Sequence, residues 1–299
     1  MSESNLEVGS YVQNVKAPDW GIGKILELGN EGKRRVLFEY AGLKNMQPLN
    51  LSPFDPPENH PLLRSISAAT DLTGVKSFVA MEEEFTRQFK NGGFEDPEYI
   101  KEERSYKLEA AEQMRTQCSK ENLEALLKAG DYAEICERAT RPVVKTNLVF
   151  LIEKFTLADG LKRGPKKQEL FATSFYALLH GPGEISGRFD AFVGALEELG
   201  ACKWPIATYP LFLMEPDRYP FVKPRYIKAA AKAYAFDVRY DVHPSWQSYS
   251  SIMNFVHYVA GVLENRAKLK PRDLIDVQGF IWCSLQAAIA PKKKAAPAP

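Results

Sequence analysis

This 299-residue sequence has no marked excess of positive or negative charge, no long apolar run and no closely spaced pair of cysteines. Basic residues exceed acidic ones by a single charge, so any affinity for nucleic acid must come from local patches. No apolar run approaches the roughly 18 residues of a membrane helix. The first residues also lack the basic and apolar regions of a signal peptide. We therefore expect a cytoplasmic protein without a membrane partner.

The cysteines and histidines are few and lie far apart. There are four of each, and the cysteines form no C-x-x-C pair. Such spacing argues against a zinc site and fits reduced thiols in a cytoplasm. We therefore expect neither a bound metal nor a cofactor. The residues are Cys118, Cys136, Cys202, Cys283, His60, His180, His243 and His257.

The composition is ordinary for a globular protein, with 45% hydrophobic and 26% charged residues, and suits one large domain or two smaller ones. Within residues 1–52, short β-rich runs occur at 11–15, 23–28 and 34–40. The segments between them contain the glycine or asparagine that tight turns need. Several short strands in so few residues predict a small SH3-like β-barrel.

The stretch from 11 to 46 resembles the small module appended to some UvrD-type helicases and related to the CarD/tudor group. The matching features are a G-x-G-x-[IV] turn and strand at 21–25 and a V-x-F strand at 36–38. The resemblance implies a non-catalytic module that binds proteins or nucleic acid. A protein partner is therefore expected to dock on it.

A proline-rich linker at 53–71 precedes a helical region at 72–290. Apolar residues recur there at helical spacing, and Ser119 is placed to cap a helix. The tail at 291–299 has low complexity and is predicted to be disordered. The fold class is thus a mainly α-helical domain with a small N-terminal SH3-like β-barrel. Helices are predicted at 97–118, 147–158, 166–179, 186–199, 204–214, 224–234, 246–266 and 272–288.

Residues 199–230, LGACKWPIATYPLFLMEPDRYPFVKPRYIKAA, resemble the core of the helix-hairpin-helix DNA glycosylases, the superfamily that contains endonuclease III and MutY. In that family a glycine hairpin leads into a helix, and a corner that carries an aspartate opens the next helix. The resemblance extends over much of residues 145–290. It implies base flipping, followed by cleavage of the N-glycosidic bond to leave an abasic site.

The sequence departs from this family at two points. The hairpin keeps only Gly200, and the position of the aspartate that stabilises the sugar cation is occupied by Lys223. Lys223 could bind a phosphate, because Pro224 opens a helix whose free N–H groups favour an anion. It could instead be an amine nucleophile, if burial or a cationic neighbour lowers its pKa. The third interpretation is an exposed lysine with no special role.

Basic and aromatic residues gather on separate segments and predict a groove that follows a DNA backbone. The alternative for each segment is a solvated helix face. The candidate DNA-contacting residues are Lys162, Arg163, Lys166, Lys167, Lys203, Trp204, Lys223, Arg225, Tyr226, Lys228 and Gln278.

A carboxylate in the C-terminal helix could replace the missing acid. Asp276 lies among apolar residues, and a buried carboxylate is costly unless it is paired or used in chemistry. Gln278 would then read a base edge or orient water. The alternative is that Asp273 and Asp276 cap the helix and pair locally. Glu184, beside a Gly-Pro-Gly turn, is a further catalytic candidate, together with Asp276 and Lys223.

These features together predict a DNA glycosylase that acts on double-stranded DNA with modified bases. Bacterial defence glycosylases that remove glucosylated hydroxymethylcytosine from phage DNA are the relatives that the resemblance suggests. Two alternatives remain open. One is a non-catalytic DNA-binding protein, and the other is an adaptor that docks a helicase or polymerase through the small module.

Overall fold

A computed structural model describes residues 6–55, 58, 60–67, 70–144, 146–265 and 269–289. The chain forms two compact units. The first comprises Met1–Gln88, Arg225–Asp237 and Phe280–Pro299, and the second comprises Phe89–Pro224 and Val238–Gly279. The predicted tail at 291–299 lies outside the described residues.

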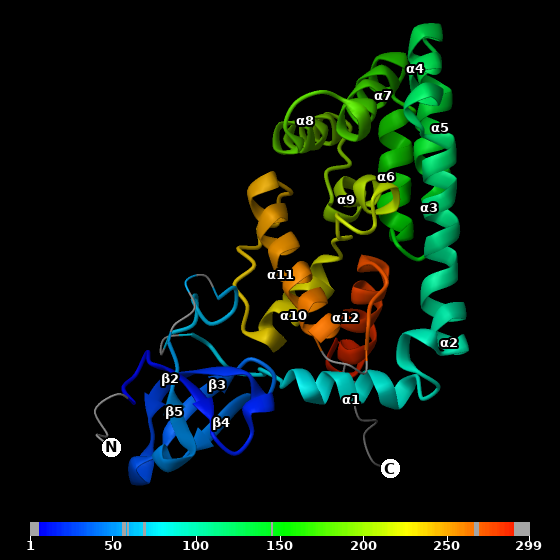
Figure 1. Ribbon diagram of the computed structural model, residues 1–299. Coiled ribbons are helices and arrows are strands. Elements are labelled where there is room, and N and C mark those ends of the chain that lie inside the picture. Colours follow the sequence, from blue (N-terminus) through cyan, green and yellow to red (C-terminus); the bar gives the residue numbers. More distant parts are fainter. Residues whose placement is uncertain are drawn as a thin grey trace, which may run out of the picture. The chain divides into compact units, whose positions relative to one another are not determined.

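The first unit contains an antiparallel sheet with the strand order β4-β3-β2-β1-β5 (Figure 1). One face of the sheet buries a core that includes Val12, Ile25, Val36 and Phe38. Among the described residues β4 and β5 are edge strands, so the sheet is open and the predicted closure into a barrel is not observed. The strands are β1 (Tyr11–Asn14), β2 (Ile22–Leu28), β3 (Arg34–Phe38), β4 (Gly42–Met46) and β5 (Leu51–Pro53).

Part of the segment predicted as a linker is packed. Leu62, Leu63 and Ile66 are buried. The ammonium group of Lys24 on β2 donates to the carbonyls of Leu63 and Ile66, at 3.0 and 2.8 Å. Residues 60–66 therefore form part of the first unit, because their apolar side chains are buried and their carbonyls are bonded to the sheet.

Three helical segments complete the first unit: α1 (Phe78–Gln88), most of α10 (Pro224–Tyr234) and the C-terminal part of α12 (Leu274–Ile289). The Phe78 ring lies 5.5 Å from that of Phe280 on α12 and 6.2 Å from that of Tyr234 on α10. The sequence predicted a single helical domain at 72–290. The observed division differs because these aromatic contacts join α1 to helices far along the chain.

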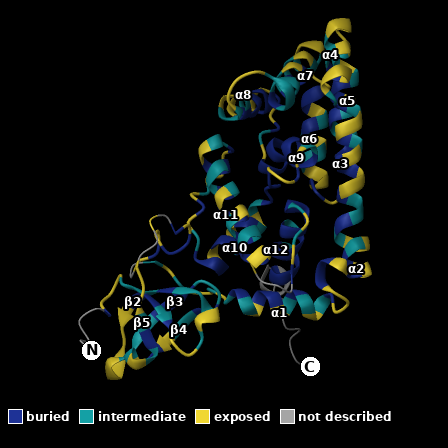
Figure 2. Ribbon diagram, in the orientation of Figure 1, coloured by how far each residue is buried: buried dark blue, intermediate teal, exposed yellow. Residues whose placement is uncertain are grey.

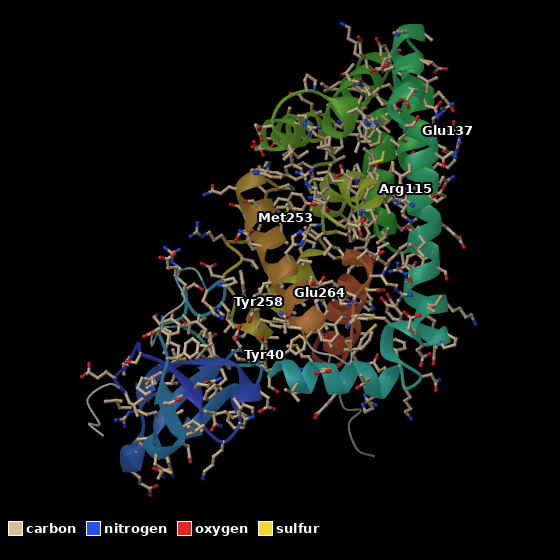
Figure 3. All side chains as sticks on the ribbon, viewed as in Figure 1. Tyr40, Arg115, Glu137, Met253, Tyr258 and Glu264 are labelled. Carbon is tan, nitrogen blue, oxygen red and sulfur yellow. The ribbon has the colours of Figure 1, made fainter. Side chains whose placement is uncertain are left out.

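In the part of the second unit that the structure describes, the regular elements are all helices. Helices α3, α5 and α7 pack side by side, and α9, which packs on α3 and α7, is buried along almost its whole length (Figure 2). The side chains of Arg115 on α3 and Glu137 on α5 extend into solvent (Figure 3). The helices are α2 (Pro97–Tyr99), a π-helical turn (Ile100–Arg104), α3 (Ser105–Gln117), α4 (Lys120–Ala129), α5 (Tyr132–Val144), α6 (Leu151–Leu161), α7 (Pro165–His180), α8 (Ile185–Glu198), α9 (Trp204–Met214) and α11 (Trp246–Asn265).

The predicted cap of α4 is confirmed, because the side chain of Ser119 accepts a hydrogen bond from the Asn122 N–H. Helices α9 and α10 begin and end where the sequence predicted. None of the helices in the described part of the chain combines the length and the apolar character needed to cross a membrane.

Helix α6 approaches the turn after α8 closely at Gly160. A Cβ atom at this position would lie 2.6 Å from the Leu199 carbonyl oxygen. We therefore expect Gly160→Ala to destabilise the protein by roughly 1–3 kcal/mol in urea unfolding, because backbone must move to admit the methyl group. Gly194→Ala in α8, where a Cβ would meet nothing within 4 Å, should instead stabilise by up to about 1 kcal/mol. Equal effects of the two substitutions would contradict this close approach.

Candidate functional site

The lysine at the start of α10 is buried. Only 8% of Lys223 is exposed, which overturns the interpretation of an exposed lysine. Its ammonium group donates to the Asn147 carbonyl at 2.9 Å and lies 4.6 Å from the centroid of the Phe150 ring. Pro224 is the first residue of α10, as predicted. The side chain is thus held between a backbone carbonyl and an aromatic face.

Burial and charged neighbours change the acidity of Lys223. Burial lowers the pKa of its ammonium group to about 8, and the cation of Lys107 acts in the same direction, while Glu153 opposes both. Lys107 on α3 is itself buried and lies 3.2 Å from Glu103. Desolvation and a cationic neighbour are the two conditions under which a lysine amine becomes a nucleophile near neutral pH.

Glu153 on α6 is one of two carboxylates that act on Lys223, the other being Glu103. Burial raises the pKa of Glu153, whereas the Phe150 N–H that it accepts and the cations of Lys223 and Lys203 lower it. Lys203 in the predicted hairpin turn and Lys223 at the predicted corner thus both lower the pKa of Glu153. No local pattern pointed to Glu153, because Glu153 and Lys223 are brought together only by the fold.

The lowered pKa of Lys223 makes stability depend on pH. The folded protein loses this proton near pH 8, whereas the unfolded chain holds it until about 10.5, the usual value. Since the unfolded state binds more protons in between, stability should rise with pH across this interval, by at most about 3 kcal/mol. Urea unfolding of the wild type and of Lys223→Met across that interval measures the difference. The same slope in both proteins would contradict the shift.

The structure brings two of the predicted DNA-binding segments together. Arg163 lies beside the turn after α8, where a Cβ added to Gly200 would be 3.6 Å from its Nη2. Lys167, in the first turn of α7, donates to both the carbonyl and the carboxylate of Glu198, at 2.9 and 3.0 Å. Exposed Lys203 follows in the same turn. The segments 162–167 and 199–203 therefore form one basic surface, partly neutralised by Glu198.

Trp204 differs from its predicted role. The side chain is buried, and its indole N–H donates to the Asp241 carbonyl at 2.8 Å. It could stack on a DNA base only if α9 unpacked, so its burial speaks against the predicted DNA contact. It instead anchors the start of α9 to the segment before α11.

Three predicted DNA contacts belong to the other unit. Arg225 and Lys228 are exposed on α10, one turn apart, opposite a buried face that includes Ile227 and Ala230. Tyr226 stacks on Trp282, with ring centroids 3.9 Å apart. The basic stripe predicted on this helix is therefore present, but the ring of Tyr226 is engaged within the unit.

Asp276 is fully buried, as predicted, but it is surrounded by hydrogen-bond donors. Arg104 donates to Oδ1 at 2.9 Å, and Arg272 donates to Oδ2 through its backbone and its side chain. The Tyr99 hydroxyl donates to Oδ1 at 2.9 Å. Asp273 pairs with Arg104 and accepts from backbone N–H groups at the start of α12. Because donors saturate both oxygens of Asp276, the geometry favours the alternative of local pairing.

Two further predicted residues lie apart from these contacts. Oε1 of Gln278 is buried and has no hydrogen-bond partner among the described residues, so this acceptor is open to a ligand or water. Glu184 is exposed and is the residue before α8.

An apolar surface, missed at the sequence level, surrounds the start of α6. Phe150, Leu151, Ile152 and Phe155 are each more than half exposed. Phe150 is also the ring beneath the Lys223 ammonium group. Exposed apolar side chains that are contiguous mark interaction sites, whereas single exposed apolar side chains are common on any protein surface.

Comparison of the chain with known protein families, with curated proteins and with solved structures gives no match. The function has to be inferred from Lys223 and its surroundings.

Proposed function

We propose that this chain is a DNA glycosylase in which the amine of Lys223 attacks the sugar of a flipped nucleotide. The observation that supports the proposal is the burial of Lys223 between the Asn147 carbonyl and the Phe150 ring, where the cation of Lys107 also lowers its pKa. With a pKa of about 8, roughly a tenth of the amine is uncharged at neutral pH, against less than about a thousandth for an ordinary lysine.

This mechanism does not need the aspartate that the helix-hairpin-helix glycosylases carry at the position of Lys223. The amine nitrogen forms a bond to C1′ as the N-glycosidic bond breaks, and the bonding electrons leave with the base, which takes up a proton. Glu153, whose pKa is raised by burial, is suited to supply that proton. The nitrogen bound to C1′ returns a proton to the Glu153 carboxylate, and O4′ takes up a proton as the C1′–O4′ bond breaks, which gives an iminium ion. Water then adds to C1′, and the C1′–nitrogen bond breaks to release the abasic site and the lysine amine.

Duplex DNA is the proposed substrate because basic and apolar surfaces occur together on the second unit. Helix α6 begins at the exposed apolar residues 150–152 and ends at Lys162 and Arg163, beside the turn that carries Lys203. Basic side chains neutralise phosphates, and apolar side chains insert between base steps in proteins that distort DNA.

Incubation with duplexes that contain plain or modified bases, followed by heating in alkali, tests the activity. Strand breaks at the position of a modified base are expected, and borohydride should trap a covalent complex between protein and DNA. Salt-dependent binding without breaks on any substrate would identify a non-catalytic DNA-binding protein. The absence of both binding and breaks would favour the adaptor that docks a partner through the open β-sheet.

A further inference from the structure

Three side chains capable of binding a metal converge at the end of α8. The Nε2 atom of His243 lies 3.7 Å from Sγ of Cys202 and contacts a carboxylate oxygen of Glu197. One ligand atom from each residue lies within 4.8 Å of the others. The side chains of His243 and Glu197 are about half exposed, at 54% and 52%, so an ion can reach them from solvent.

The local fold holds these residues in place before any ion binds. Gly200, with a φ of +70°, ends α8 in a turn in which its N–H donates to the Glu197 carbonyl, and this turn brings Cys202 back beside Glu197. On the other side, the His243 N–H donates to the Asp241 carboxylate at 2.9 Å. The Asp241 carbonyl accepts from the indole of Trp204, which is two residues after Cys202.

The geometry does not match a Cys-His-Glu catalytic triad. In a triad the nucleophile and the carboxylate contact opposite nitrogens of the imidazole. Here Cys202 and Glu197 both face Nε2 of His243.

We propose that Glu197, Cys202 and His243 bind one Zn²⁺ ion, with water in the fourth position. Thiolate, imidazole and carboxylate are the ligands that zinc uses. Tetrahedral zinc would place the sulfur and the nitrogen about 3.5 Å apart, close to the separation of 3.7 Å between Cys202 and His243. Three protein ligands with a water in the fourth position are a known zinc coordination, distinct from the four protein ligands of closed structural sites. This site does not depend on the glycosylase activity.

The ion would link two segments that are separate in the sequence. Cys202 lies in the turn that carries Lys203, and His243 lies in the segment before α11. Zinc would also bring positive charge to a surface that otherwise carries the carboxylates of Glu197 and Glu198. Metal binding would therefore make the turn more rigid and add positive charge to the basic surface beside it.

Zinc alone, added to the chelator-treated full-length protein in competition with a chromophoric indicator, tests the site. One equivalent should bind at micromolar or lower concentration, and Co²⁺ should give a thiolate charge-transfer band. Cys202→Ser, His243→Gln and Glu197→Gln should each weaken zinc binding at least about tenfold. Cys202→Ser should also abolish the band.

Matched controls exist for two of the ligands. Glu198→Gln, next to Glu197, and His257→Gln, at another exposed histidine, should leave zinc binding unchanged. All five substitutions lie at positions that are not fully buried, and the circular dichroism spectrum verifies that each variant folds. Binding that needs millimolar zinc, equal affinity of ligand and control variants, or a cobalt spectrum without a thiolate band would each overturn the site.

Discussion

Lys223→Ala should abolish strand cleavage at modified bases, with a loss of turnover on the order of a thousandfold or more. The substitution removes the only atom that the proposed mechanism uses to form a bond with the sugar. Lys223→Arg should be equally inactive although it keeps the positive charge, because a guanidinium group is not deprotonated in proteins. Both variants should also lose the complex that borohydride traps. Cleavage of an alkali-labile duplex, measured in single turnover, gives the rates.

The arginine variant separates the two surviving interpretations of Lys223. If Lys223 only binds phosphate, Lys223→Arg should retain most of the turnover, because arginine also binds phosphate. Turnover by Lys223→Arg would therefore contradict the assignment of Lys223 as the nucleophile. Loss of DNA affinity in Lys223→Ala with restored affinity in Lys223→Arg would assign the residue to phosphate binding. Lys120→Ala, at an exposed lysine of α4, is the control for loss of a single positive charge and should retain full activity.

Arg104→Ala should destabilise the second unit by about 3–5 kcal/mol, the largest effect on stability that we expect from one substitution. Arg104 is buried and donates to Asp276 at 2.9 Å and to Asp273 at 2.8 and 2.7 Å. Its removal leaves Asp273 without its cation and leaves the fully buried Asp276 paired with Arg272 alone. Urea unfolding monitored by circular dichroism measures the loss, and a double-mutant cycle with Asp276 gives the coupling between the two charges.

Two comparisons make this result specific. Arg115→Ala removes an exposed ion pair with Glu112 and should change stability little. Asp276→Asn should lower stability and leave turnover of the folded fraction intact, because both oxygens of Asp276 are already occupied by Tyr99 and the two arginines. Full stability of Asp276→Asn with loss of turnover would restore Asp276 as the catalytic carboxylate.

The sequence predicted best those helix ends that are set by residues close to one another in the chain. Pro224 fixes the start of α10, and Ser119 caps α4 through an N–H three residues away. The pairing of Asp276 with Arg104 spans 172 positions, and that of Lys223 with the Asn147 carbonyl spans 76. No periodicity or spacing carries such information. The sequence therefore indicated that Asp276 was buried, but not what it was buried against.

The same reason explains the contrast between the expected absence of zinc and the proposed zinc site. Sequence spacing detects ligands that lie on one turn or one hairpin, such as a C-x-x-C pair. Cys202 and His243 are 41 positions apart and meet because the turn after α8 leads into α9, whose first residue, Trp204, donates to the Asp241 carbonyl in the segment before α11. Ligands assembled in this way become visible only in three dimensions.

The division of the chain has a consequence for modularity. From the N-terminus to the C-terminus, the polypeptide passes between the two units four times. Deleting the first 88 residues would remove the partners of Tyr234 and Phe280 and expose apolar surface on α10 and α12. The N-terminal segment that contains the β-sheet therefore cannot be deleted without exposing the core of the first unit, and no single truncation of the chain yields either unit alone.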